Sequence, residues 1–129
     1  MRIMAVFYEL QQFGPDITVA VLNGQLNLGN RLMEFEHTIK QRIREGSRKM
    51  IFLLGGLTYI DSAGLGMVAT CAGAMAEAGG RLVVVSAGGK IRHMFETTRL
   101  DRVIDFYSDF DSACQSFSKP PQSPKESAS

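Results

Sequence analysis

Hydrophobic and polar positions change period along this chain, and the changes predict its strands and helices. Two apolar stretches, residues 3–10 and 17–22, have the length and composition of strands. The turn residues 14–16 between them predict a hairpin, and Gly24 is expected to end the second strand. Apolar residues then recur at spacings of three and four up to Gly46, which predicts an amphipathic helix; they are Leu32, Phe35, Ile39 and Ile43.

Two unbroken apolar runs, Met50–Leu54 and Leu82–Val85, are typical of strands that are covered on both faces. A helix is expected between them, from Ala63 to Ala78, with two glycines after it. Strand, helix and strand in this order predict a parallel pair joined by a right-handed crossover.

Three further elements are expected after the second run: a short helix around Ile91, Met94 and Phe95, a strand over residues 103–106, and a final helix over residues 109–117. The predicted fold class is therefore a single α/β domain. It has a mixed, mostly parallel sheet of about four or five strands packed with about four helices.

Composition agrees with one globular domain and narrows the function classes. The chain has 129 residues, of which 45% are hydrophobic and 21% charged. Its net charge of +1 gives no reason to expect direct nucleic-acid binding. We expect the domain to span residues 1–117, followed by a flexible tail over residues 118–129, which contains three prolines and four serines.

No apolar run is long enough for a signal peptide or a membrane span, so we expect a cytoplasmic protein without membrane insertion. Cys71 and Cys114 lack a CxxC spacing, and the residues around His37 and His93 form no metal-binding motif. Neither a metal ion nor a cofactor is therefore expected.

The candidate chemistry lies at Asp61 and Ser62, where the first buried strand is expected to pass into the small-residue helix. A helix N-terminus stabilises an anionic group by about 0.3–1 kcal/mol, because its N–H groups and dipole present positive charge. Ser62 is therefore a candidate site of phosphorylation. The simpler alternative is that this pair only caps the helix.

The predicted helix is unusually rich in small residues, including Ala63, Gly64, Gly66 and Gly73. A glycine inside a helix costs about 1 kcal/mol relative to alanine, so these positions indicate a requirement for close packing or close contact. The apolar neighbours Leu65 and Met67 are candidates for partner contacts.

The stretch from Leu53 to Val68, LLGGLTYIDSAGLGMV, resembles the signature of STAS domains, the family of bacterial anti-sigma factor antagonists. Gly24-Gln25-Leu26-Asn27 is similar to the family's first-loop pattern of glycine, any residue, leucine and aspartate. Residues 81–113 also follow the family's usual order of strand, short helix, Leu-Asp-Arg, strand and final helix. The resemblance covers approximately residues 3–117.

This resemblance implies partner switching. The dephosphorylated domain binds an anti-sigma factor that is also a serine kinase, which releases a sigma factor for transcription, and phosphorylation reverses the binding. Ser62 is then the expected phosphoacceptor, and a PP2C-type phosphatase is expected to remove its phosphate. The implied partner-binding residues are Gly24, Asn27, Asp61, Ser62, Ala63, Gly64, Leu65 and Met67. The chain itself is expected to be non-enzymatic, with no catalytic residues, and a monomer or weak dimer.

Three positions depart from the family pattern: Asn27 replaces an aspartate, Leu53 an acidic residue, and Arg99 a glycine that usually ends a helix. Two alternatives stay open. One is a STAS adaptor or scaffold in a sensory or lipid-transport complex without a phosphoswitch. The other is a nucleotide-binding enzyme, because residues 64–69 formally spell GxGxxA, but no acidic residue follows Val85 where a ribose would need one.

Overall fold

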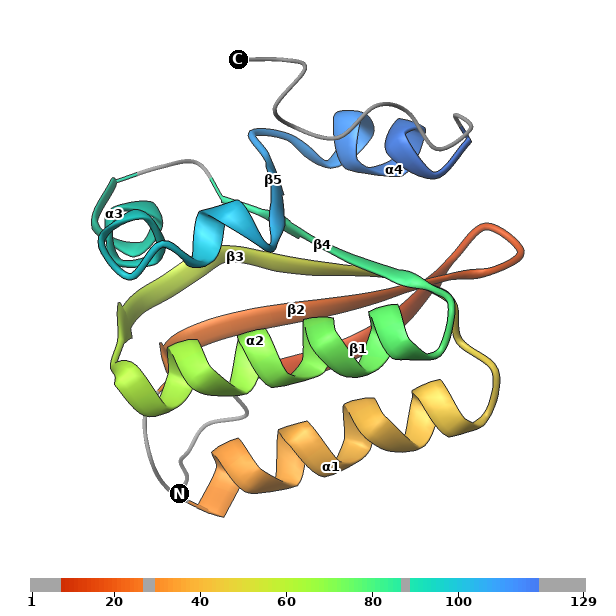
Figure 1. The fold of residues 1–129 in the computed structure, drawn as a ribbon, viewed down its shortest axis with the longest axis horizontal. Helices are drawn as coiled ribbons and strands as arrows, with labels where there is room; N and C mark the ends of the chain where they lie inside the picture. Colours follow the sequence, from red (N-terminus) through yellow and green to blue (C-terminus); the bar gives the residue numbers. More distant parts are fainter. Residues whose placement is uncertain (1–7, 27–29, 87–88, 119–129) are drawn as a thin grey trace.

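A computed structural model of the chain describes residues 8–26, 30–86 and 89–118 (Figure 1). Its centre is a five-stranded sheet in the order β1-β2-β3-β4-β5, in which β1 runs antiparallel to β2 and the remaining neighbours are parallel. The strands are β1 (Tyr8–Phe13), β2 (Ile17–Leu26), β3 (Lys49–Ile60), β4 (Arg81–Val85) and β5 (Asp105–Tyr107). The predicted fold class is confirmed.

Helices cover both faces of the sheet, with α1 and α2 on one side and α4 on the other (Figure 1). They are α1 (Asn30–Arg44), α2 (Ser62–Glu77), α3 (Gly89–Thr97) and α4 (Phe110–Ser118), together with a short 3-10 turn, η1 (Leu100–Arg102). The helix α3 joins the same core as α1 and α2, through Ile91 and Phe95.

Alternation along the strands divides the apolar side chains between two cores. In β3, Met50 and Phe52 point toward α1 and α2, whereas Ile51 between them belongs to the smaller core beneath α4. Burial on both faces explains why this part of the strand appears in the sequence as an unbroken apolar run.

Glycines end two helices where the sequence predicted that they would. Gly46 and Gly79 have φ angles of +111° and +89°, a region that favours glycine. The departure at Arg99 also has a structural consequence, because this residue follows α3 with a φ of +65° and is the only described residue other than glycine with a positive φ. Arg99 therefore adopts a left-handed backbone conformation that glycine would adopt at a lower cost in free energy.

The clearest correction concerns the first two parallel strands. Gly24 does not end its strand, because β2 continues to Leu26, and β3 runs six residues beyond Leu54, to Ile60. These two extensions pair with each other over residues 23–26 and 56–60. Residues 55–60, which lie between the apolar run and Asp61, are therefore part of the sheet.

The last predicted strand is also displaced. Val103 is 73% exposed and follows the η1 turn, and pairing with β4 begins only at Asp105. The predicted strand over residues 3–10 is found from Tyr8 onward, while residues 3–7 lie outside the described part of the chain, as do residues 119–129 of the expected tail.

Arg81 connects β4, β5 and α4. Its guanidinium donates to the Asp105 carboxylate at 2.8 Å, to the Tyr107 hydroxyl at 3.0 Å and to the Ser116 hydroxyl at 3.2 Å. These charge-assisted bonds raise the pKa of Arg81 against the opposing effect of its burial. The final helix is therefore held to the sheet by polar contacts as well as by its apolar face.

Candidate docking site at the start of helix α2

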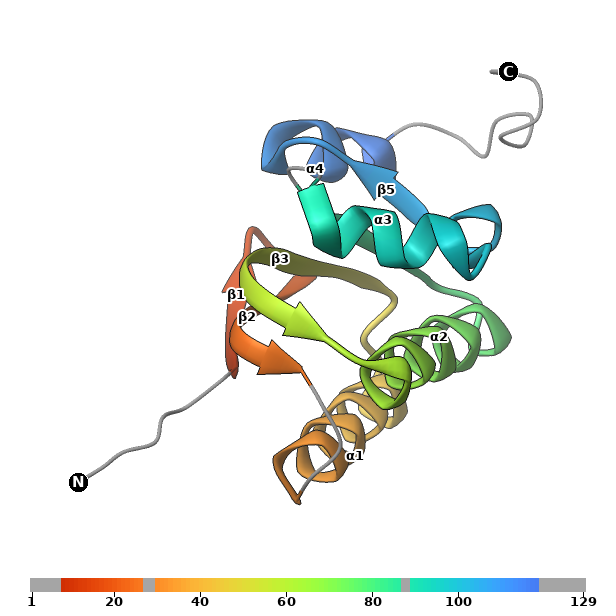
Figure 2. The same ribbon diagram turned by 90° about the vertical axis from the view of Figure 1, so that its left-hand side faces the viewer.

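The site is built where β3 passes into α2, at the end of the molecule that faces the viewer in Figure 2. Asp61 is the N-cap of α2, with extended backbone angles, and its carboxylate accepts the Gly64 N–H at 2.9 Å. A cap of this kind stabilises a helix by about 1 kcal/mol. The backbone N–H of Asp61 also donates to the Leu26 carbonyl at 3.2 Å, which ties the start of α2 to the end of β2.

Ser62 is the first residue of α2, and its side chain is exposed. The capping function belongs to Asp61, as the simpler alternative expected of the pair, and Ser62 follows it as the first helical residue. Its hydroxyl lies in the first turn, where the unpaired N–H groups of a helix favour an added anion.

Gly64 is buried where α2 touches β2. A methyl group placed on its Cα would lie 2.4 Å from the Leu26 carbonyl oxygen and 2.9 Å from a side-chain carbon of Ile60. Only glycine permits this approach, so the close-packing explanation is correct for Gly64.

Leu65 and Met67, two of the predicted partner contacts, turn inward. Each is 3% exposed and belongs to the core between the sheet and the helices, and Ala63 packs against that core. Their side chains therefore hold α2 in place and do not form the surface around Ser62. Packing against the sheet determines which side of α2 faces inward. The sequence of the helix alone therefore did not show that Leu65 and Met67 would be buried.

The outward face of α2 is smooth and uncharged from Ser62 to the last turn. Its exposed residues are Ser62, Gly66, Thr70, Gly73 and Ala76, and the single charged residue of the helix is Glu77. A methyl group on Gly66 or Gly73 would meet nothing within 4 Å. The fold thus has no need of these two glycines, although each costs about 1 kcal/mol of helix stability.

The other predicted site segment begins in β2, whose end is tied to the start of α2. Gly24 is exposed in the extended part of β2 with a φ of +82°, and Asn27 lies outside the described residues. Sequence reasoning missed Tyr59, which is 49% exposed three residues before Ser62. The aromatic residue before the Asp-Ser pair was visible in the sequence, but the apolar run around it indicated burial.

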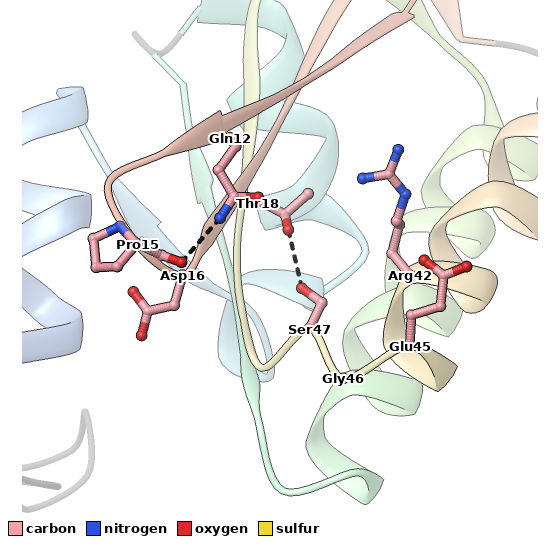
Figure 3. A pocket seen from close by; sticks show the side chains of 8 residues that line it. All are labelled: Gln12, Pro15, Asp16, Thr18, Arg42, Glu45, Gly46 and Ser47. Carbon is pink, nitrogen blue, oxygen red and sulfur yellow. Dashed lines mark hydrogen bonds between the residues drawn. The ribbon is translucent and has the colours of Figure 1, made fainter.

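Hollows elsewhere on the described surface lie away from Ser62. One of about 300 Å³ is at the opposite end of β3, between the β1–β2 turn and the end of α1 (Figure 3). Its floor holds the Thr18 and Ser47 hydroxyls, 3.1 Å apart, and its lining residues are Gln12, Pro15, Asp16, Thr18, Arg42, Glu45, Gly46 and Ser47. A second, of about 330 Å³, lies along β5 beside Arg92.

The cysteines show no sign of reactivity at this site. Burial, with a smaller contribution from Glu36, raises the pKa of the Cys71 thiol from 9.0 to about 12, and Cys114 in α4 is half-buried. Within residues 8–26, 30–86 and 89–118, no cluster of three or more His, Cys, Asp or Glu residues could hold a metal ion. No helix in those ranges has the length and apolar character needed to cross a membrane.

Comparison with known proteins agrees with this architecture. The family model of the STAS domain matches residues 11–113. Over 99 residues, the chain is 27% identical to BtrV of Bordetella bronchiseptica, provisionally named an anti-sigma factor antagonist, covering 77% of this chain and 84% of that protein.

Solved structures share the fold at lower sequence identity. An anti-sigma factor antagonist from Mycobacterium paratuberculosis superposes with a TM-score of 0.75 at 18% identity, over 87% of this chain and 93% of that one. The Bacillus cell fate determinant SpoIIAA, solved in its phosphorylated form, gives a TM-score of 0.68 at 18% identity, over 84% of this chain and 98% of that one.

The mixed five-stranded sheet and its helices thus place the protein in a class: it is an α/β domain with the SpoIIAA-like fold. The match over residues 11–113 makes the family explicit: the chain belongs to the STAS domain family.

Proposed function

We propose that this protein is a non-enzymatic anti-sigma factor antagonist that is switched off by phosphorylation of Ser62. The observation that carries the proposal is the exposed Ser62 hydroxyl in the first turn of a capped helix, at the head of an uncharged face. Membership of the STAS family and the similarity to BtrV support the choice of an anti-sigma factor as partner.

Because this face of α2 is uncharged, a single phosphate at Ser62 would be enough to weaken partner binding strongly. Phosphorylation adds about 1.5–2 negative charges, which a docked partner would have to desolvate next to the Asp61 carboxylate. Each loss of about 1.4 kcal/mol in binding free energy lowers affinity tenfold, so a penalty of about 3 kcal/mol gives about a hundredfold.

The free domain would tolerate the same phosphate. Ser62 is exposed, and the α2 N-terminus offsets part of the added charge. The modification therefore changes binding without unfolding the protein. The proposed partner is an anti-sigma factor with serine kinase activity, and a PP2C-type phosphatase would restore the binding form in the cytoplasm.

The test is affinity capture from a lysate of the native organism with wild-type, Ser62→Ala and Ser62→Asp baits, followed by mass spectrometry. We expect wild type and Ser62→Ala to retain a serine-kinase-type anti-sigma factor, and Ser62→Asp to lose it. Ser118→Asp is the matched control, because it adds the same charge at the end of α4, on the other side of the sheet. It should bind like wild type.

Capture of one non-kinase complex by all four baits would contradict the switch and establish the adaptor alternative. Phosphoserine mapping of the protein isolated from cells supplies a second readout. Phosphate at Ser62 that disappears under conditions in which the anti-sigma factor is bound would support the proposal.

A further inference from the structure

The extended part of β3 has an unusual burial pattern that its pairing with β2 explains. Leu54, Leu57 and Ile60 are buried at intervals of three, although a regular strand buries every second residue. The pairing partners of β2 advance from Leu53 to Gly56 and then from Leu57 to Tyr59, so β3 carries an extra residue at two places. The strand is therefore bulged twice before it reaches Asp61.

Thr58 is the extra residue of the second bulge, opposite the step from Gly24 to Gln25. In a regular strand that continued from Leu57, Tyr59 would point inward and Ile60 outward. The added residue reverses both, so Ile60 is 2% exposed and Tyr59 is 49% exposed. The bulge is thus the feature that turns an aromatic side chain outward beside Ser62.

A side-chain hydrogen bond spans this bulge. The Thr58 hydroxyl donates to the Gly24 carbonyl at 3.1 Å, joining residues that are 34 positions apart in sequence. Gly24 lies in the left-handed region, which glycine adopts readily, at a register shift of the ladder. The bond connects the strand that leads into Ser62 to the segment that leads toward residue 27.

We infer that Thr58 is a positioning residue of the docking site: its bond to Gly24 fixes the bulge that presents Tyr59 and holds β2 against the part of β3 that leads into α2. The inference rests on the proposed function for its consequence in partner binding. The geometry of the bulge can be tested on the free protein alone.

Thr58→Val removes the hydroxyl and keeps the shape of the side chain, whereas Thr58→Ser keeps the hydroxyl. The matched control is Thr97→Val in α3, which loses a hydroxyl bond to the His93 carbonyl at 2.9 Å within one helix. NMR-detected amide exchange over residues 23–26 and 59–61 measures local opening. Relaxation of the Tyr59 ring protons by a soluble gadolinium chelate measures the exposure of that ring.

In Thr58→Val we expect amide exchange over these residues to accelerate about three- to tenfold, as for the loss of one hydrogen bond, together with a changed relaxation of the Tyr59 ring. Thr58→Ser should restore both readouts, and Thr97→Val should leave both unchanged. The melting temperature of Thr58→Val should match that of Thr97→Val, since both bonds are exposed. Equal exchange in Thr58→Val and wild type would overturn the inference.

Capture of the anti-sigma factor completes the test. Thr58→Val should retain about three- to tenfold less of it than wild type, with rescue by Thr58→Ser. Failure of wild type to capture any anti-sigma factor would count against the proposed function only, because the exchange and ring measurements decide the role of Thr58 independently.

Discussion

Alanine substitution at Gly64 and at Gly66 adds the same methyl group to α2 at positions two residues apart, with opposite expected effects on stability. At Gly66 the methyl group points into open space, with no atom within 4 Å. Alanine is favoured over glycine in a helix by about 0.5–1 kcal/mol. We therefore expect Gly66→Ala to raise the free energy of unfolding by about that amount.

At Gly64 the same preference is outweighed by a steric clash. The new methyl group would lie 2.4 Å from the Leu26 carbonyl oxygen, which is backbone and cannot rotate away. Overpacking of this kind costs about 1–3 kcal/mol, so the net expectation is a loss of about 1–2 kcal/mol. The two variants should differ by about 1.5–3 kcal/mol, which is the sum of the opposite effects.

Urea unfolding followed by circular dichroism measures both changes, and an unchanged m-value shows that the transition still involves the same surface. Stabilisation by Gly64→Ala, or destabilisation by Gly66→Ala, would refute the packing of α2 against β2 described above. Gly66→Ala has a second use. It retains the fold but adds a methyl group to the uncharged face of α2. Weaker capture of the anti-sigma factor by this stable variant would therefore place the interface along α2.

Three other outcomes are expected. Arg99→Gly should stabilise the protein by about 0.5–1 kcal/mol, because glycine adopts the left-handed conformation at lower cost, whereas an equal gain in Arg99→Ala would contradict this reason. Arg81→Met should lower the unfolding free energy by about 1–2 kcal/mol, since its bonds to Asp105 and to α4 are half-exposed; a thermal melt unchanged from wild type would refute the role of Arg81. In native protein at pH 8, N-ethylmaleimide should modify Cys114 and leave Cys71 intact until urea is added, whereas equal rates would show that Cys71 is accessible.

The sequence by itself determined the order and type of most elements, because local periodicity and composition carry that information. The apolar runs around Met50 and Val83 marked strands buried on both faces, and spacings of three and four marked α1. The Asp61-Ser62 pair, at a change from apolar to small residues, was enough to place the candidate site at a helix start.

Only the tertiary structure decided which side chains of the site reach its surface. Leu65 and Met67 turn inward because the rotation of α2 is set by its packing on the sheet, and Tyr59 turns outward because pairing between β2 and β3 inserts Thr58 as a bulge. Both effects arise between segments that are far apart in sequence, as the bond from Thr58 to Gly24 illustrates. Local patterns therefore located the site, and long-range pairing determined the surface that it presents.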